Sequence, residues 1–122
     1  FAFGQDVYAK RGWILVDTKY EFGRDKNGMI RVIDEIHTPD SSRLWVRDSY
    51  EARVKAGQAP EMLDKETVRR YLMDQGFSGH GDVPGVPADR IIDLALIYLH
   101  VAEKLRGEPL LSEGPDQHFP NL

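Results

Sequence analysis

The stretch DTKYEFG, residues 17–23, places a charged side chain at every second position: Asp17, Lys19 and Glu21. Successive side chains of a β-strand point to opposite faces, so this alternation predicts a strand with one charged face. Tyr20 and Phe22 would then hold the strand to a core. The charged face would be either a solvated surface or one wall of a functional site.

The chain has 122 residues and a formal net charge of −4, and it contains no cysteine. This length suits one domain with a core of its own. The absence of cysteine excludes disulfides and thiolate metal sites. The charge gives no electrostatic reason to expect nucleic acid or a membrane as partner. Since the chain opens with FAFGQDVYAKRG and no initiator Met, we expect a domain or fragment of a longer protein.

The chain pattern predicts an α+β fold, with an antiparallel hairpin inside a sheet that packs against two or three helices. Strand-forming residues surround a turn at Asn27-Gly28, and a helical pattern stopped by Gly107 is apolar on so much of its circumference that we expect it to be largely buried. The expected segments are a helix end at 1–12, the hairpin at 13–36, a loop at 37–47, helices at about 61–76 and 88–106, and a coil tail at 107–122.

The hairpin predicts a pair of acidic side chains that face each other. If Asn27-Gly28 forms a two-residue turn, Glu21 lies opposite Asp34. Like charges in that position are destabilising unless a cation lies between them, and Mg²⁺ binds through one or two carboxylates with water and phosphates. A turn centred on Asp25-Lys26 would instead place Asp17 opposite Asp34. The competing interpretation is a solvated face on which Lys19 offsets the acids.

Two further polar groups accompany the hairpin. The loop TPDSSR, residues 38–43, combines a carboxylate, two hydroxyls and a guanidinium beside a proline: Asp40, Ser41, Ser42 and Arg43. An arginine binds phosphate or carboxylate through a planar fork, although the same loop could be an ordinary turn. In DKETVRRY, residues 64–71, Asp64 is a good helix N-cap, and Lys65 and Arg69 share one helix face that could meet an anion or water.

Taken together, ILVDTKYEFG, DEIHTPDSSRLW and DKETVRRYL closely resemble the C-terminal part of the SAICAR synthetase family of purine biosynthesis. The resemblance extends from about residue 8 to residue 107. It implies a cytoplasmic ligase that uses ATP and Mg²⁺ to join L-aspartate to carboxyaminoimidazole ribonucleotide (CAIR). ATP would activate the CAIR carboxylate as an acyl phosphate, which the amine of aspartate attacks.

The resemblance also implies roles for the polar residues. Glu21 and Asp34 resemble the pair that binds Mg²⁺ with the nucleotide phosphates. Lys19 resembles a catalytic residue near the reacting carboxylate or phosphate, and Asp17 resembles a catalytic residue that orients this lysine or the substrate. The substrate-binding residues would be Asp40, Ser41, Ser42, Arg43, Lys65 and Arg69.

The family's N-terminal nucleotide-binding domain has no counterpart in these 122 residues. We therefore expect the chain to be inactive alone and to need that N-terminal half as its partner, with a homo-oligomer also open. Two other hypotheses are a non-catalytic folded fragment that binds Mg²⁺ or anions, and a two-carboxylate Mg²⁺ enzyme acting on phosphate esters.

Overall fold

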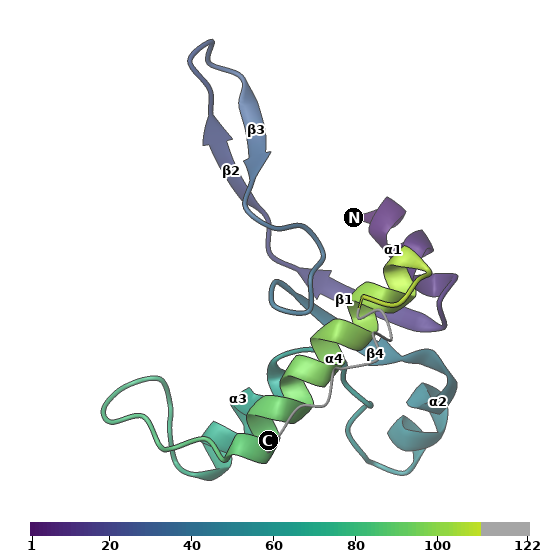
Figure 1. The fold of residues 1–122 in the computed structure, drawn as a ribbon, viewed down its shortest axis with the longest axis vertical. Helices are drawn as coiled ribbons and strands as arrows, with labels where there is room; N and C mark the ends of the chain where they lie inside the picture. Colours follow the sequence, from purple (N-terminus) through teal and green to yellow (C-terminus); the bar gives the residue numbers. More distant parts are fainter. Residues whose placement is uncertain (111–122) are drawn as a thin grey trace, which may run out of the picture.

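The computed structural model describes residues 1–110 and shows an α+β fold, which confirms the predicted class (Figure 1). The elements, in chain order, are α1 (Ala2–Ala9), β1 (Trp13–Thr18), β2 (Glu21–Arg24), β3 (Ile30–Ile33), β4 (Ser42–Val46), α2 (Arg47–Lys55), α3 (Glu66–Asp74) and α4 (Ala88–Arg106). The strands form two separate antiparallel pairs, β1–β4 and β2–β3. The predicted single sheet is therefore wrong.

The β1–β4 pair carries a bulge that decides which side chains leave the core. Leu15 pairs with Leu44, and Asp17 pairs with Arg43, so the register shifts by one and Val16 is the extra residue. Without the shift, Asp17 would lie on the same face as the buried Leu15. The bulge moves Asp17 to the opposite face, because bulges re-aim the side chains that follow them.

The core lies against this strand pair. Its buried apolar side chains come from α1, both strands and α4: Tyr8, Trp13, Leu15, Leu44 and Val101. On the outer edge of β4, the segment 61–63 continues the ladder through the bridge between Trp45 and Met62 and the bond from the Leu63 amide to the Leu44 carbonyl, 2.8 Å. Residues 61–63 are therefore fixed along the outer edge of β4, just before α3 begins.

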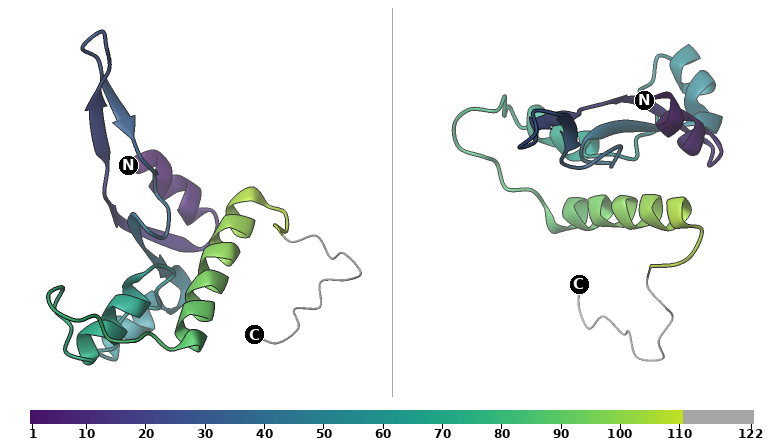
Figure 2. Two further views of the ribbon diagram at one scale, coloured as in Figure 1. Left: turned by 60° about the vertical axis from the view of Figure 1, so that its left-hand side comes forward. Right: turned by 90° about the horizontal axis from the view of Figure 1, so that it is seen from above.

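Helix α4 has the bounds that the sequence predicts and ends at Gly107, which adopts the left-handed conformation (φ 81°). It forms a layer of its own beside the strands (Figure 2). Arg11 binds its last turn, since the guanidinium donates to the Lys104 carbonyl at 3.0 Å and to the Leu105 carbonyl at 2.8 Å. Val101 is the only residue of α4 that is fully buried.

The expectation that α4 is largely buried is wrong for the described residues. Ile91 and Leu96 are 56% and 57% exposed. The strand layer lies on one side of the helix (Figure 2), whereas the apolar residues extend around much of its circumference, so that several of them stay exposed.

The β2–β3 hairpin projects away from the rest of the fold (Figure 1). Its turn has three residues, Lys26 to Gly28, because the Asp25 amide donates to the Met29 carbonyl at 2.9 Å and Gly28 takes up φ 82°. This is a common hairpin loop with glycine in the left-handed position. Both turns considered from the sequence are therefore wrong.

The three-residue turn changes the register of the hairpin by one residue. Glu21 pairs with Ile33 and not with Asp34; such a slip moves every side chain to the other face. Phe22 is 60% exposed, so the expectation that it anchors the strand in a core is also wrong. Tyr20 does contact the body of the fold, through a hydrogen bond between its hydroxyl and His37.

The structure differs from several of the segments predicted from the sequence. Residues 37–47 were expected to be loop but contain β4, residues 47–60 were unassigned but contain α2, and the helix expected at 61–76 is shorter, since α3 begins at Glu66 and ends at Asp74. The predicted coil tail lies largely in 111–122, outside the described residues. Among the helices of residues 1–110, none has the length and apolar character needed to cross a membrane.

Gly4 provides a test of how α1 packs on the rest of the fold. It is buried in α1, and a Cβ built there would lie 2.4 Å from the His37 ring. Replacing glycine by alanine inside a helix normally stabilises by about 0.5–1 kcal/mol, but here the added methyl overpacks a filled site. We expect Gly4→Ala to lower the free energy of unfolding by about 1–2 kcal/mol, measured by urea denaturation. Gly85→Ala is the control, because nothing lies within 4 Å of its Cβ; equal stability of the two variants would contradict this packing.

Candidate functional site

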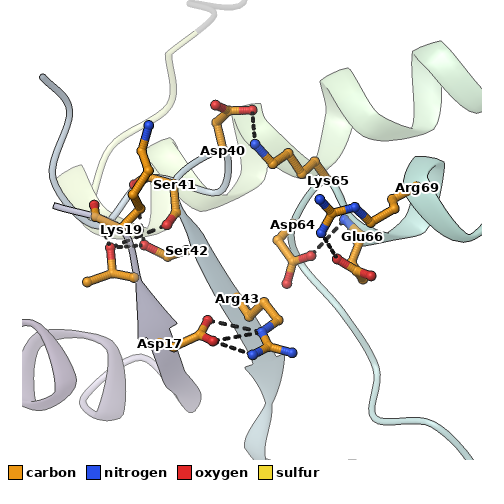
Figure 3. Close-up of a pocket in the computed structure, with 11 residues that line it drawn as sticks. Asp17, Lys19, Asp40, Ser41, Ser42, Arg43, Asp64, Lys65, Glu66 and Arg69 are labelled. Carbon is orange, nitrogen blue, oxygen red and sulfur yellow. Dashed lines mark hydrogen bonds and ion pairs between the residues drawn. The ribbon is translucent and has the colours of Figure 1, made fainter. Parts of the chain in front are cut away.

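A pocket of about 460 Å³ lies where β1, the loop before β4 and the start of α3 meet. It collects all the site residues predicted from the sequence except Glu21 and Asp34: Asp17, Lys19, Asp40, Ser41, Ser42, Arg43, Lys65 and Arg69 (Figure 3). Three further residues in its lining, Thr18, Asp64 and Glu66, were not predicted as site residues. The pocket therefore joins three sequence segments, residues 17–19, 40–43 and 64–69.

Asp17 and Arg43 face each other across the β1–β4 pair. The Arg43 Nε lies 3.0 Å from both carboxylate oxygens, and its Nη2 also donates to Oδ2. This hydrogen bonding holds the pKa of Asp17 below its ordinary range and raises the pKa of Arg43. Both side chains are about half exposed, so the guanidinium is oriented and still accessible to an anionic ligand.

Asp40 and Lys65 form a second pair at the opposite side of the pocket (Figure 3). The Lys65 Nζ lies 3.2 Å from the Asp40 Oδ1, and this hydrogen bond holds the pKa of Asp40 below its usual value. The Tyr98 hydroxyl of α4 lies 3.5 Å from the same oxygen. Burial raises the pKa of Tyr98 to about 12, so this phenol stays protonated and acts as a donor to Asp40.

The hydroxyl groups of the loop bond mainly to their neighbours. Ser42 is buried, and its hydroxyl donates to the Thr18 hydroxyl at 2.9 Å. Ser41 accepts the Thr38 amide at 3.2 Å through its hydroxyl. Its carbonyl accepts the Lys19 amide at 2.9 Å. The loop is thus held in one conformation by side chains that bond locally to its own backbone.

Arg69 extends along the pocket from α3 and pairs with Glu66, 3.3 Å away. Arg69 and Lys65 lie on one helix face as predicted, since residues four apart are neighbours on a helix, and both line the pocket with Arg43. With Lys19, four cationic groups therefore surround one cavity, each beside a carboxylate.

Glu21 and Asp34 lie outside this pocket but converge on Lys19. The Lys19 Nζ is 2.6 Å from the Glu21 carboxylate and 3.8 Å from the Asp34 carboxylate. Asp34 reaches this position with a left-handed backbone (φ 67°), which is uncommon outside glycine although Asp tolerates it better than most residues. The hydrogen bond to Glu21 raises the pKa of Lys19.

This arrangement bears on the proposed metal. Two carboxylates, Glu21 at the start of β2 and Asp34 just after the end of β3, approach one cationic group. The donor set therefore suits a cation, and the Lys19 ammonium lies between the two carboxylates. Within residues 1–110 no group of three or more His, Cys, Asp or Glu side chains could hold a metal ion. Mg²⁺ needs only one or two protein carboxylates when waters and phosphates complete its shell, so Glu21 and Asp34 fit it.

Asp64 was expected only as a helix cap, but it is a buried member of the pocket, 1% exposed. Its Oδ1 accepts the Glu66 amide at 2.8 Å, and its Oδ2 accepts the Leu44 amide at 2.8 Å. Burial raises the pKa of this carboxyl, while the two amide bonds oppose the rise. The N-cap residue of α3 is Lys65 and not Asp64 as predicted, although the Asp64 side chain does bond to the first residue of the helix. Nothing in the sequence indicated the bond to β4.

A folded strand pair that presents fixed cations, hydroxyls and carboxylates around one cavity defines a domain that can bind a phosphorylated or carboxylated small molecule. The family model for SAICAR synthetase matches residues 1–84. The chain belongs to the SAICAR synthetase family. It is 46% identical over 115 residues to phosphoribosylaminoimidazole-succinocarboxamide synthase of Legionella pneumophila, covering 93% of this chain and 37% of that one.

Two solved structures share the fold. SAICAR synthase from Saccharomyces cerevisiae in complex with SAICAR aligns with a TM-score of 0.69 at 33% identity, over 91% of this chain and 36% of that one. A type-2 SAICAR synthetase in complex with ADP aligns with a TM-score of 0.56 at 33% identity, over 88% of this chain and 34% of that one. The chain thus spans about a third of the length of the relatives it matches.

The Asp17–Arg43 pair predicts a pH dependence. A carboxyl whose folded pKa is depressed stabilises the fold above its unfolded pKa, and this contribution is lost as pH falls through the folded value. Because both groups are exposed, we expect the contribution to be about 0–1 kcal/mol. In Arg43→Met, the pKa of Asp17 should return toward its ordinary value of 3.8, followed by carboxyl NMR during an acid titration. In Arg69→Met it should stay low; an unchanged Asp17 pKa in Arg43→Met would contradict the pairing.

Proposed function

We propose that the whole protein to which this chain belongs is an ATP-dependent ligase that joins L-aspartate to CAIR and releases SAICAR, ADP and phosphate. The single observation that carries the proposal is the pocket in which Arg43, Lys65 and Arg69 face one cavity. Family membership supports it, as do the complexes of similar proteins with SAICAR and with ADP. We propose a cytoplasmic location from the family resemblance.

The chemistry sets the demand on the site. ATP converts the CAIR carboxylate to an acyl phosphate with release of ADP, and the amine of aspartate then attacks the acyl carbon and displaces phosphate. ATP, CAIR, aspartate and the developing oxyanion are all negatively charged, so fixed cations must hold them together. Arg43, Lys65 and Arg69 would bind the phosphate and carboxylate groups of CAIR, and Lys19 would lie beside the reacting carboxylate.

The carboxylates of the pocket have a separate role in this proposal. Asp17 holds the fork of Arg43 in one orientation, which lowers the entropy cost of binding an anion. Asp40 is held by Lys65 and would accept a hydrogen bond from a sugar hydroxyl of CAIR. Ser41 and Ser42 shape the wall between them, and their hydroxyls bond to Thr38 and Thr18.

Glu21 and Asp34 would hold Mg²⁺ with the ATP phosphates. The ion would neutralise phosphate charge during transfer. Lys19 would then leave the position between the two carboxylates and turn to the substrate. The observation that supports this arrangement is that both carboxylates already converge on the Lys19 ammonium.

The rest of the protein would supply the nucleotide-binding part. The hairpin leaves Phe22 and Ile30 about 60% exposed, and an apolar surface of this kind is typical of an interface. We propose that the N-terminal half of the same enzyme covers it, with association of identical chains as the other possible cover. Two competing functions stay open to test: binding without catalysis, and hydrolysis of phosphate esters.

Removing either proposed metal ligand tests the assignment in the whole protein. We expect Glu21→Ala and Asp34→Ala each to reduce turnover by about 100-fold or more, because phosphate charge is then poorly neutralised. The assay is ADP release at several Mg²⁺ concentrations. Asp48→Ala, an exposed acid on α2, is the matched control. Turnover that is unchanged in Glu21→Ala and Asp34→Ala across the Mg²⁺ series would sink the metal assignment.

The activity of the 122-residue chain alone tests whether turnover requires the rest of the protein. We expect no ADP formation with ATP, CAIR and aspartate, since the chain spans about a third of its relatives. The whole protein should form ADP only when CAIR and aspartate are both present. ADP formation without aspartate would favour a phosphate-releasing enzyme, and turnover by the chain alone would show that the remaining part is not required.

A further inference from the structure

At Leu44, the hydrogen bonds on the outer edge of β4 change from a backbone partner, Leu63, to a side-chain partner, the carboxylate of Asp64. The Leu44 carbonyl accepts the Leu63 amide at 2.8 Å, and the Leu44 amide donates to the Asp64 Oδ2 at 2.8 Å. The backbone ladder between β4 and residues 61–63 therefore ends on a side chain. Since the Leu44 side chain is fully buried, losing this acceptor would leave its amide without a partner in an apolar setting.

The second oxygen of the same carboxylate bonds to the other wall of the pocket. The Asp64 Oδ1 accepts the amide of Glu66, the first residue of α3, at 2.8 Å. Leu44 follows Arg43 in the chain, and Glu66 follows Lys65. One buried carboxylate thus joins the backbones that carry the cations on both sides of the pocket (Figure 3).

Only a carboxylate satisfies this geometry. Both amides are donors, and an ionised aspartate offers two acceptor oxygens, whereas an asparagine would turn its NH₂ toward one of the amides. An ordinary helix cap would need only the bond to α3. The additional bond to β4 spans 20 residues of sequence and is not required to begin a helix. With both oxygens already accepting amides, the group is also poorly placed to transfer a proton.

We propose that Asp64 is a positioning residue that sets the separation between Arg43 and the Lys65–Arg69 face of α3, and so determines the affinity for the phosphorylated substrate. The substrate role rests on the proposed function. The carboxylate itself contacts backbone amides and not the ligand. Its loss lets α3 move relative to β4, so that the cations on the two walls no longer bind one anion together.

The test uses the whole protein with Asp64→Asn and Asp64→Ala. We expect the KM for CAIR to rise about tenfold or more in Asp64→Ala, as a buried amide without its partner would produce, and less in Asp64→Asn, which keeps one acceptor. The KM for ATP should change by less than about twofold, because the nucleotide is held elsewhere. Val101→Ala is the matched control, since it truncates a core residue of α4 away from the pocket. It should lower stability and leave both KM values unchanged.

A merely structural role would make the Asp64 variants behave as Val101→Ala does, with less active enzyme and native KM values, and that result would overturn the proposal.

A second measurement separates the positioning role from the proposed function: titration of the whole protein with ribose 5-phosphate by calorimetry. Native protein should bind this probe, and Asp64→Ala should bind it about tenfold more weakly. Equal binding by the two proteins, or none by the native one, would contradict the positioning role. Binding without CAIR turnover would retain that role and reject the ligase.

Discussion

The pairing of β1 with β4 is the constraint on which the rest of this structure depends. Leu15 and Leu44 meet on its inner face and are almost fully buried. The bulge at Val16 then turns Asp17 to the outer face, opposite Arg43. A single extra residue therefore divides the same two strands into a part that makes the core and a part that makes the pocket. Hydrogen bonds to this strand pair and its ends also hold the loop before β4 and the segment that leads into α3.

The cationic side chains of the pocket are oriented by neighbouring acids. Each cation has a carboxylate beside it: Lys19 has Glu21, Arg43 has Asp17, Lys65 has Asp40, and Arg69 has Glu66. These pairs are exposed, so each contributes little to stability. Their main effect is to keep the long side chains ordered. A multiply charged ligand gains from several oriented cations at once while displacing only weak internal pairs.

The exposed apolar surfaces have a common physical explanation. The hairpin β2–β3 and the outer side of α4 both carry large apolar side chains that are about half exposed or more. A domain rarely leaves such surface uncovered, and this chain spans about a third of the proteins it resembles. Glu21 and Asp34, the proposed metal ligands, lie at the base of the same hairpin and outside the pocket; in the proposed enzyme, the part that binds the nucleotide would lie next to them.

The sequence by itself determined the α+β class, the bounds of α4, the family, and nearly all the polar residues that line the pocket. These features depend on local periodicity, on Gly107, and on the order of DTKYEFG and TPDSSR along the chain. Only the tertiary structure decided the register of the hairpin, because a three-residue turn and a two-residue turn both suit Asn27-Gly28. It also decided that β1 pairs with β4 and that Asp64 bonds to Leu44, since contacts between distant segments depend on packing and leave no periodic pattern in either one.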